Sequence, residues 1–583
     1  MGSYFFGGSM KSLKEFKPLL KLIREDRKKL IFASILVFVA SLSGIFSGYL
    51  NGADIESITA LKVKESLMYL GAYLAIELIL DGVIGCTANA MLSRIEASLT
   101  VKLSFLTYKK SLDLPSVAYE EKSSGEIINR VTNDAEALSS VFNQLLRTLS
   151  SLVGSILILF YIFYNSWIIG LEILLFLLTL YFILKKYNPL LEKVHKEIRQ
   201  QNDSFISLTT ESVRGIREIK TLGIKHSLID DVKNIIKLAY SKVGNRLELS
   251  RKFNILTEGL KTFLEVGVFA TCVILLYYKQ ISLTFFIAMT FYVYRYMWLI
   301  ENINNLTQTY QKVVVSISRV NEILENKLYD DEQFGTKEIN NITGVIEFKD
   351  VTFAYPNEDT TLNKFSLTLE PNKKIAIVGK SGQGKSTLFN LMTRIFDPIS
   401  GEILLDGVNI QKLSEEELRK SISIIRQEPF IFNRTIKENF ELIDKDITVE
   451  DIRKYTKMAY LDDYIMSLPK GYDTILGEGG VNLSGGQKQR LAIARTLSKK
   501  SKVILFDEAT SALDNSSQEF IKKAIDNLVK DHTVIIVAHR LSTIMDADII
   551  HVVDDGKIVA SGTHKELLKS SLIYRNLYET ESL

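Results

Sequence analysis

Residues 374–387 read Lys-Ile-Ala-Ile-Val-Gly-Lys-Ser-Gly-Gln-Gly-Lys-Ser-Thr, and this stretch decides the fold of the second half of the chain. The apolar run 375–378 predicts a short buried strand, and the residues from 387 onward predict a helix. Glycines at such a junction let backbone N–H groups wrap phosphate oxygens, while the helix N-terminus and a lysine add favourable charge. The predicted nucleotide-binding residues here are Gly379, Lys380, Ser381, Gly382, Gln383, Gly384, Lys385, Ser386 and Thr387.

A second apolar strand, 503–506, ends in the carboxylate pair Asp507-Glu508. Asp507 is placed to hold Mg²⁺ together with the hydroxyl of Ser386, and Glu508 to polarise the attacking water as a general base. The alternative is a carboxylate pair that only caps a helix. The strand ends 122 residues after Lys385 (507 − 385), in the order of a nucleotide-hydrolysing domain, which favours the catalytic interpretation.

A further glycine motif lies between these two. It reads Leu483-Ser484-Gly485-Gly486-Gln487 and precedes a predicted helix over 488–499. A hydroxyl, bare backbone amides and a helix N-terminus make a second anion site. Because one domain does not need two phosphate cradles for one nucleotide, the second predicts a nucleotide held by another copy of the domain. The motif therefore indicates a dimer with ATP at its interface.

The first half of the chain is predicted to span a membrane. Six apolar stretches are long enough to cross about 30 Å of hydrocarbon, which takes about 20 residues. They cover roughly residues 30–50, 67–91, 149–164, 168–184, 255–278 and 281–300. Charged, helix-periodic segments after the second and fourth stretches predict helices that continue beyond the bilayer on one side.

The region before the first stretch sets the predicted orientation. Residues 11–29 hold eight Lys or Arg, so the N-terminus is expected in the cytoplasm, and six spans return the C-terminus there. Apolar residues at three- and four-residue steps predict an amphipathic helix in the interface over 11–29, the alternative being a plain stop-transfer cluster. Residues 1–10 are interpreted as an artificially added or disordered segment, 11–325 as the transmembrane domain, 326–344 as a linker and 345–583 as the nucleotide domain.

Composition excludes several classes of protein. The chain has 583 residues, with 71 basic and 68 acidic side chains and a net charge of +3, so no nucleic-acid partner is indicated. Apolar content of 46% with 24% charged residues excludes intrinsic disorder. The two cysteines, Cys86 and Cys272, provide neither a disulfide framework nor a metal cluster.

With these motifs in view, residues 345–583 resemble an ATP-binding cassette, and the six-span half fused to it resembles the half-size exporters of that family. The resemblance implies a membrane α-helical domain joined to an α/β P-loop NTPase domain, with ATP and Mg²⁺ as ligands. It implies further roles by position. Tyr355 matches the aromatic that stacks on adenine, Gln427 the glutamine that senses Mg²⁺, and His539 the switch histidine on the γ-phosphate.

The same resemblance assigns roles to several loops. Glu478 matches a loop that faces the membrane domain, and 511–514 a loop that communicates across the dimer. Residues 124–134 resemble the first intracellular loop, and 113–119 would be the coupling helix that rests on the cassette. Ser484, Gly485, Gly486 and Gln487 would complete the ATP site of the partner.

An exporter of this kind is expected to be an ATP hydrolase that moves an amphipathic drug, lipid or peptide across the bacterial inner membrane by alternating access. Intact Glu508 and His539 favour a homodimer. One subunit of a heterodimer and a cassette-fused channel or receptor regulator remain alternatives. A soluble mechanical ATPase would lack the charge-free run 30–50.

Polar residues within the spans are the candidates for cargo contact. Glu77 and Asp81 lie four residues apart in the second span. In the sixth, an aromatic and basic group suits stacking and cation–π contact: Tyr292, Tyr294, Arg295, Tyr296 and Trp298. Either set lines a cargo cavity, or it makes ion pairs between helices or lies near the water interface.

Overall fold

The computed structural model describes residues 17–121, 124–325, 332–355, 358–380, 382–477, 480–507, 515–529, 531–537 and 544–582. Two compact units result, one of residues 1–112 and 124–327 and one of residues 113–123 and 328–583. They are called the membrane unit and the cassette unit below.

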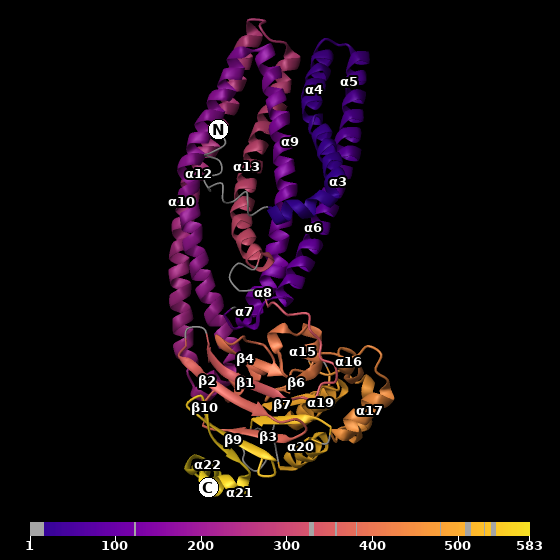
Figure 1. The fold of residues 1–583 in the computed structure, drawn as a ribbon. Coiled ribbons are helices and arrows are strands. Elements are labelled where there is room, and N and C mark those ends of the chain that lie inside the picture. Colours follow the sequence, from indigo (N-terminus) through magenta and orange to yellow (C-terminus); the bar gives the residue numbers. More distant parts are fainter. Residues whose placement is uncertain are drawn as a thin grey trace. The chain divides into compact units, whose positions relative to one another are not determined.

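The membrane unit consists of helices. Among the described residues, six of its helical stretches are long and apolar enough to cross a membrane. The elements are α3 (Lys17–Ser41), α4 (Ser43–Thr59), α5 (Val63–Ile76), η1 (Glu77–Gly85), α6 (Cys86–Leu112), α8 (Ser124–Asn129), η2 (Arg130–Asp134), α9 (Ala135–Asn165), α10 (Trp167–Arg214), α11 (Ile216–Leu222), α12 (Lys225–Tyr277) and α13 (Leu283–Leu324). Helices α10 and α12 run alongside each other over most of their length (Figure 1).

The helix lengths follow the sequence pattern with two differences. The first helix does not end near residue 29, because α3 continues to Ser41 and the break comes at Leu42. Its first turns run across the unit before it turns along the other helices (Figure 1). The second apolar stretch contains a π-helical segment, η1, at Glu77–Gly85, where the wider turn interrupts the α-helix. Such insertions are uncommon and recur at functional sites.

Small residues allow α4 and α13 to approach closely. Gly44, Gly48 and Gly52 repeat every four residues on α4, and each faces a residue of α13. A Cβ added at Gly52 would lie 2.2 Å from the carbonyl oxygen of Thr284. Glycine is therefore required here, as in other membrane helix pairs whose backbones touch. The contact also fixes Tyr292, which is fully buried and donates to the Ile45 carbonyl at 2.8 Å.

A buried charge cluster joins α8, η2 and α13 at the other end of the unit. The guanidinium of Arg130, whose side chain is 4% exposed, donates to Glu126 at 2.6 Å and pairs with Glu322 at 2.8 Å. It also donates to the Arg319 carbonyl at 3.1 Å. Asp134 accepts from Ser316 at 2.6 Å. A buried arginine held by several partners favours one arrangement of the helices around it.

The cassette unit contains two sheets. Its strands are β1 (Ile346–Ala354), β2 (Thr360–Leu369), β3 (Lys374–Val378), β4 (Ser400–Leu405), β5 (Val408–Asn409), β6 (Ile422–Ile425), β7 (Val503–Asp507), β8 (Thr533–Val537), β9 (Ile549–Asp554) and β10 (Lys557–Gly562). One sheet has the order β2-β1-β4-β5 and is antiparallel, and the other has the order β10-β9-β3-β8-β7-β6. From β9 to β6 the second sheet is parallel.

Helices complete the cassette unit. They are α7 (Ser116–Glu121), α14 (Lys385–Met392), η3 (Ile410–Lys412), α15 (Glu415–Ser421), α16 (Ile436–Glu441), α17 (Val449–Met458), α18 (Asp462–Ser467), η4 (Gly471–Asp473), α19 (Gly485–Ser498), α20 (Asn515–Leu528), α21 (His564–Ser570) and α22 (Leu572–Ser582). Helix α7 comes from the loop between two membrane helices, yet its Val117 packs against the core formed by β1, β2 and α14.

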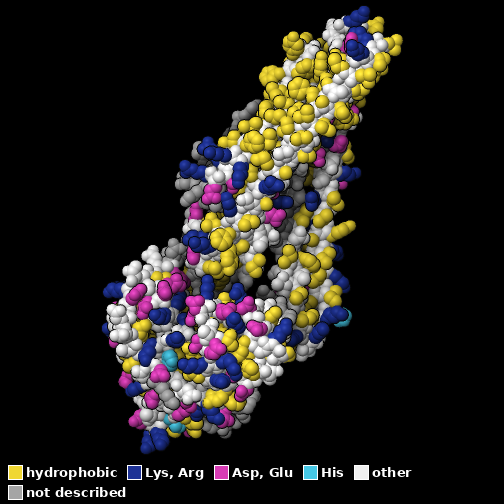
Figure 2. Space-filling view, turned by 90° about the vertical axis from the view of Figure 1, so that its right-hand side faces the viewer, with side chains coloured by type: hydrophobic (Ala, Val, Ile, Leu, Met, Phe, Trp, Pro, Cys, Tyr) yellow, Lys and Arg dark blue, Asp and Glu magenta, His cyan; other side chains and the backbone are white. Residues whose placement is uncertain are grey.

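The parallel strands bring their carboxyl ends to one edge of the sheet. Ile377 of β3 is level with Val537 of β8, and Val537 with Asp507 of β7. Ligands of open α/β sheets bind outside these ends, where the strand order changes direction. Figure 2 shows the surfaces that result: hydrophobic side chains gather along the membrane helices, while charged side chains cover the cassette unit.

Candidate functional site

The phosphate-binding loop, residues 379–386, joins β3 to α14, as the sequence predicts. Gly382 and Gly384 have φ angles of 82° and 83°, which L-residues with side chains rarely adopt. A Cβ added at Gly379 would lie 2.3 Å from the Val553 carbonyl oxygen, so this position also requires glycine. The loop thereby presents backbone N–H groups at the start of α14, where the helix dipole favours an anion. Of the predicted loop residues, Ser381 lies outside the described part of the chain.

Lys385 lies inside the curve of this loop. Its side chain is buried, and its ammonium donates to the carbonyl oxygens of Gly379 at 2.8 Å and Lys380 at 2.7 Å. The charge is therefore held over the same backbone that is expected to wrap a phosphate. Gln383 has a different role at the edge of the loop, because its side-chain oxygen accepts from the backbone N–H of Asp555.

Two oxygen ligands meet beside the loop. The hydroxyl of Ser386 lies 3.4 Å from Oδ1 of Asp507, although 121 residues separate them. A hydroxyl and a carboxylate are ligands of the kind Mg²⁺ prefers, and the ion usually takes its other ligands from phosphates and water. In the described residues no group of three or more His, Cys, Asp or Glu could hold a metal by itself. The pair fits Mg²⁺ bound together with a nucleotide.

Tyr355 lies near this loop in an orientation the sequence does not reveal. Its ring packs edge-on against Phe353 and Phe396, with centroid distances of 5.0 and 5.2 Å. Its hydroxyl lies 3.1 Å from that of Thr387 and accepts from the Asn390 amide at 3.3 Å. These hydrogen bonds hold the Tyr355 ring against the first turns of α14, beside the phosphate-binding loop.

The second glycine motif begins α19. Ser484 caps the helix by accepting from the Gln487 N–H at 3.3 Å, and the Gln487 side chain accepts in return from the Ser484 N–H at 2.8 Å. In the described part of the chain each of these side chains bonds only to the backbone N–H of the other residue, and Gly485 is exposed. The first turn of α19 is therefore already ordered before a nucleotide binds. Gln489 of the same helix donates to the Gln427 carbonyl at 3.1 Å, while the Gln427 side chain is exposed.

Several predicted residues lie outside the described part of the chain: Glu508, His539, Glu478 and residues 511–514. Gln489 and Asn390 were not predicted. Gln489 follows the glycine motif by two residues, and this position on the first turns of α19 was the one signal in the sequence that it lies near the site. Asn390 had no signal, because its contact depends on the tertiary position of Tyr355.

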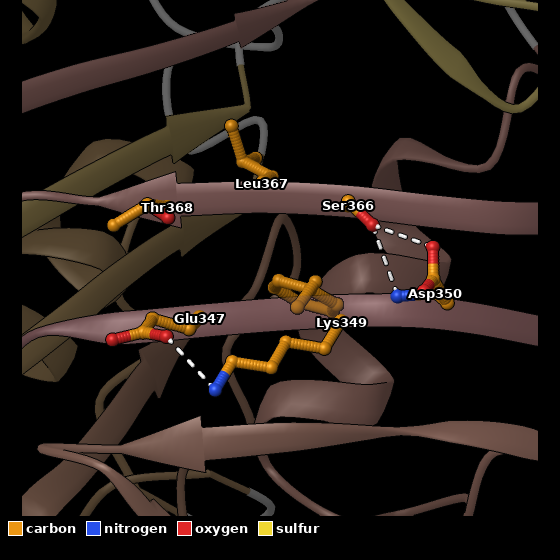
Figure 3. Close-up of a pocket in the computed structure, with 7 residues that line it drawn as sticks. Glu347, Lys349, Asp350, Ser366, Leu367 and Thr368 are labelled. Carbon is orange, nitrogen blue, oxygen red and sulfur yellow. Dashed lines mark hydrogen bonds and ion pairs between the residues drawn. The ribbon is translucent and has the colours of Figure 1, made fainter.

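A surface hollow on β1 and β2 is not a second candidate. Figure 3 shows that its charged side chains are paired within the hollow, Lys349 with Glu347 and Asp350 with Ser366. The Lys349 ammonium lies 3.5 Å from Glu347, and Ser366 both donates to Asp350 at 3.2 Å and accepts from its N–H at 2.9 Å. None of the predicted nucleotide-binding residues lines this hollow of about 470 Å³.

Comparison with known families decides the assignment. A model described as "ABC transporter transmembrane region" matches residues 30–324, and one described as "ABC transporter" matches residues 362–511. The chain belongs to the ABC transporter family. The prediction of a half-size ABC exporter is confirmed, with six spans and a cassette on one chain and ATP hydrolysis coupled to transport.

Individual relatives cover nearly the whole transporter. An "ATP-dependent lipid A-core flippase" of Photobacterium profundum is 32% identical over 537 residues, 90% of each chain. A flippase of the same name from Haemophilus influenzae (strain 86-028NP) is 31% identical over 577 residues, 98% of this chain and 97% of its own. The solved structure of a bacterial Atm1-family ABC exporter with ATP bound has the same fold, with a TM-score of 0.79 at 22% identity, covering 96% of this chain and 99% of its own.

The membrane unit of this transporter contains a cavity of about 370 Å³, here called the polar cavity. Three charged side chains line it: Arg147 of α9, Arg295 of α13 and Asp81 of η1. Arg295 donates to the Ser41 carbonyl at 2.7 Å. Cβ atoms added at Gly44 and Gly154 would lie 2.5 and 2.9 Å from its guanidinium, so glycines on two helices make room for it.

Arg147 is fixed by a relay of polar side chains. Its Nε donates to the Asn143 amide oxygen at 2.8 Å, and the Asn143 amide donates to Glu96 at 2.7 Å. Arg147 lies just before the predicted third span, 149–164, and was not among the predicted cargo residues. Helix α9 is continuous from Ala135 to Asn165, so Arg147 lies on the same helix as that span.

The remaining predicted cargo residues separate into two groups. Asp81, Arg295 and Trp298 line the polar cavity. Glu77 does not, and it accepts instead from the Ser47 hydroxyl at 2.5 Å. Tyr292 and Tyr296 are fully buried and donate to backbone carbonyls, which is packing rather than an open binding surface.

Proposed function

We propose that this ABC exporter is a lipid flippase that acts as a homodimer and moves a lipid with a phosphate-bearing headgroup across the bacterial inner membrane. The observation that carries the proposal is the pair of guanidinium groups in the polar cavity, from Arg147 and Arg295. Arginine is suited to phosphate because its planar fork donates two parallel hydrogen bonds. Charges within apolar helices are costly and are retained where they serve a pathway.

The relatives support a lipid rather than a drug or a peptide, because those at 31 and 32% identity are named for flipping lipid A-core. The exposed apolar side chains of the membrane unit give further support, since they suit contact with acyl chains. Eight basic residues in 11–29 support cytoplasmic termini.

Each nucleotide site would take residues from two copies. Gly379–Thr387 would bind the phosphates, Tyr355 the adenine, and Ser484–Gln487 of the other copy would complete the site. Glu508 would act as general base and His539 would contact the γ-phosphate. Mg²⁺, held by Ser386, Asp507 and Gln427, would neutralise charge on the transferred phosphoryl group.

A second copy is also supported by apolar surfaces left uncovered. Ile216 and Leu222 of α11 are exposed, and so are Phe430 and Phe432, which pack edge-on against each other. On each unit, exposed apolar side chains of this kind suit contacts between proteins. ATP bound between two cassettes would draw them together, and hydrolysis would release them. The polar cavity would then open in turn to one side of the membrane and to the other.

The test uses the purified chain alone in lipid bilayers. We expect ATP turnover to be stimulated by phosphate-bearing lipids more than by amphipathic drugs or peptides, and labelled lipid to move between leaflets with ATP. Glu508→Gln should abolish both while ATP binding remains. Stimulation by drugs or peptides alone would overturn the lipid assignment, and no turnover in any condition would overturn the homodimer.

A further inference from the structure

Asp81 is the charged residue of the polar cavity that phosphate binding does not explain. It lies on the π-helical segment η1, its side chain is exposed, and it lines the same cavity as Arg147 and Arg295. In the described part of the chain its carboxylate has no hydrogen bond or ion pair, although Arg295 is near enough to attract it. A carboxylate within an apolar membrane helix is costly to keep, so it calls for a partner.

Both arginines already have fixed positions. Arg295 is held by the Ser41 carbonyl at 2.7 Å and by the space at Gly44 and Gly154, and Arg147 by Asn143 at 2.8 Å. In the described part of the chain these bonds engage only Nη2 of Arg295 and Nε of Arg147, so both guanidinium groups keep other Nη donors for a phosphate in the cavity that they line. Neither arginine needs Asp81 to stay in place.

The cavity thus presents two positive groups and one negative group to its contents. A headgroup with only negative charge would be repelled by the Asp81 carboxylate at close range in a low dielectric. A headgroup that carries a phosphate and a protonated amine matches both signs. We propose that the polar cavity selects an amine-bearing phospholipid, with its phosphate on Arg147 and Arg295 and its ammonium on Asp81. This inference rests on the proposed lipid transport and specifies the cargo of that same site.

Glu77 provides a matched control for Asp81. It lies one turn away on the same π-helical segment, but it accepts from Ser47 and does not line the cavity. Removing its charge should leave headgroup preference unchanged. The two variants, Asp81→Asn and Glu77→Gln, therefore differ in whether the lost carboxylate faces the cargo.

The experiment measures ATP turnover of the full chain in nanodiscs of neutral lipid, titrated with two probes that have identical acyl chains. One probe has a phosphoethanolamine headgroup and the other a phosphoglycerol headgroup. For the unchanged protein we expect half-maximal stimulation at an about tenfold lower concentration of the amine-bearing probe, which corresponds to about 1.4 kcal/mol. Asp81→Asn should make the two probes equivalent by weakening only the amine-bearing one, and Glu77→Gln should keep the preference.

Several outcomes would overturn the inference. An unchanged protein that does not distinguish the probes contradicts it without any variant. Equal weakening of both probes by Asp81→Asn would mean that the carboxylate supports the protein itself, for example by an ion pair to a second copy. An Asp81→Asn protein that keeps the preference also contradicts it. If neither probe stimulates turnover, the lipid proposal fails as well, whereas in the other cases lipid transport stands.

Discussion

The close approach of α4 and α13 provides the sharpest test of the membrane unit. Replacing Gly52 by alanine puts a methyl carbon 2.2 Å from the Thr284 carbonyl oxygen, where ordinary contact begins at 3.4 Å. The helices must therefore separate by about 1 Å (3.4 − 2.2). A gap of that size loses a quarter to a half of the dispersion energy of the atoms concerned. Glu56, which accepts from the N–H and the hydroxyl of Thr284, would move as well.

Two opposing effects set the expected change in the free energy of unfolding of the Gly52→Ala protein. Overpacking costs about 1–3 kcal/mol, and alanine regains up to about 1 kcal/mol over glycine in helix propensity. Because the clash is with backbone, we expect Gly52→Ala to remain destabilising by about 1–2 kcal/mol, lowering the apparent unfolding temperature by about 2–6 °C. The measurement is thermal unfolding of the full chain in one lipid or detergent condition.

Gly71 is the matched control, since it lies in the next membrane helix, α5, and an added Cβ would have nothing within 4 Å. Gly71→Ala should leave the unfolding temperature unchanged or raise it slightly. If Gly52→Ala unfolds at the same temperature as Gly71→Ala, the closeness of α4 and α13 does not stabilise the unit and the reasoning is refuted.

Three further predictions concern other parts of the chain. Arg130→Met should lower stability by about 1–3 kcal/mol in thermal unfolding, less than for a fully buried pair, because Glu126 and Glu322 keep part of their hydration; an unchanged melt would contradict this. Tyr355→Phe removes only a hydroxyl and should change the Kd for ATP less than about threefold, whereas Tyr355→Ala should raise it about fivefold or more through lost stacking, and equal effects would exclude a stacking role. Burial lowers the pKa of His551 to about 4, so the unfolded chain takes up a proton before the folded one as pH falls from 6.5. Stability should therefore decrease between pH 6.5 and about 4 by up to about 1.4 kcal/mol per pH unit, and His551→Leu should flatten this dependence; a parallel pH profile for the variant would refute it.

The parts of the fold that depend on local pattern could be predicted from the sequence. Six apolar lengths predicted the six apolar helices found among the described residues, and the glycine motif predicted a loop between β3 and α14. The close contact of α4 with α13 at Gly44, Gly48 and Gly52 was not predicted, although glycines at four-residue steps are a signal for such contacts. Interactions between distant segments were less accessible. The pairing of Ser386 with Asp507 followed from known strand order rather than from local sequence.

Other features had no local signal. A π-helical turn such as η1 changes the helical period over too few residues to alter the hydrophobic pattern, so Glu77 and Asp81 looked equivalent. The structure separates them because one meets Ser47 and the other faces the polar cavity. Tyr292 and Tyr296 looked like binding residues because aromatic rings serve both purposes, and only their burial identifies packing.

The attachment of residues 113–123 to the cassette unit has a consequence for synthesis of the chain. Val117 packs against a core whose first strand begins at Ile346, so its partner is made 229 residues later (346 − 117). At about 5–20 residues per second, roughly 10–50 s pass on the ribosome before even the first strand of that core is made, and the core is complete only after Val553. During this time a cassette from a neighbouring nascent chain can bind the same segment. Correct assembly thus depends on the order in which the parts are synthesised. Misassembly between chains would be most frequent when many ribosomes translate one messenger RNA.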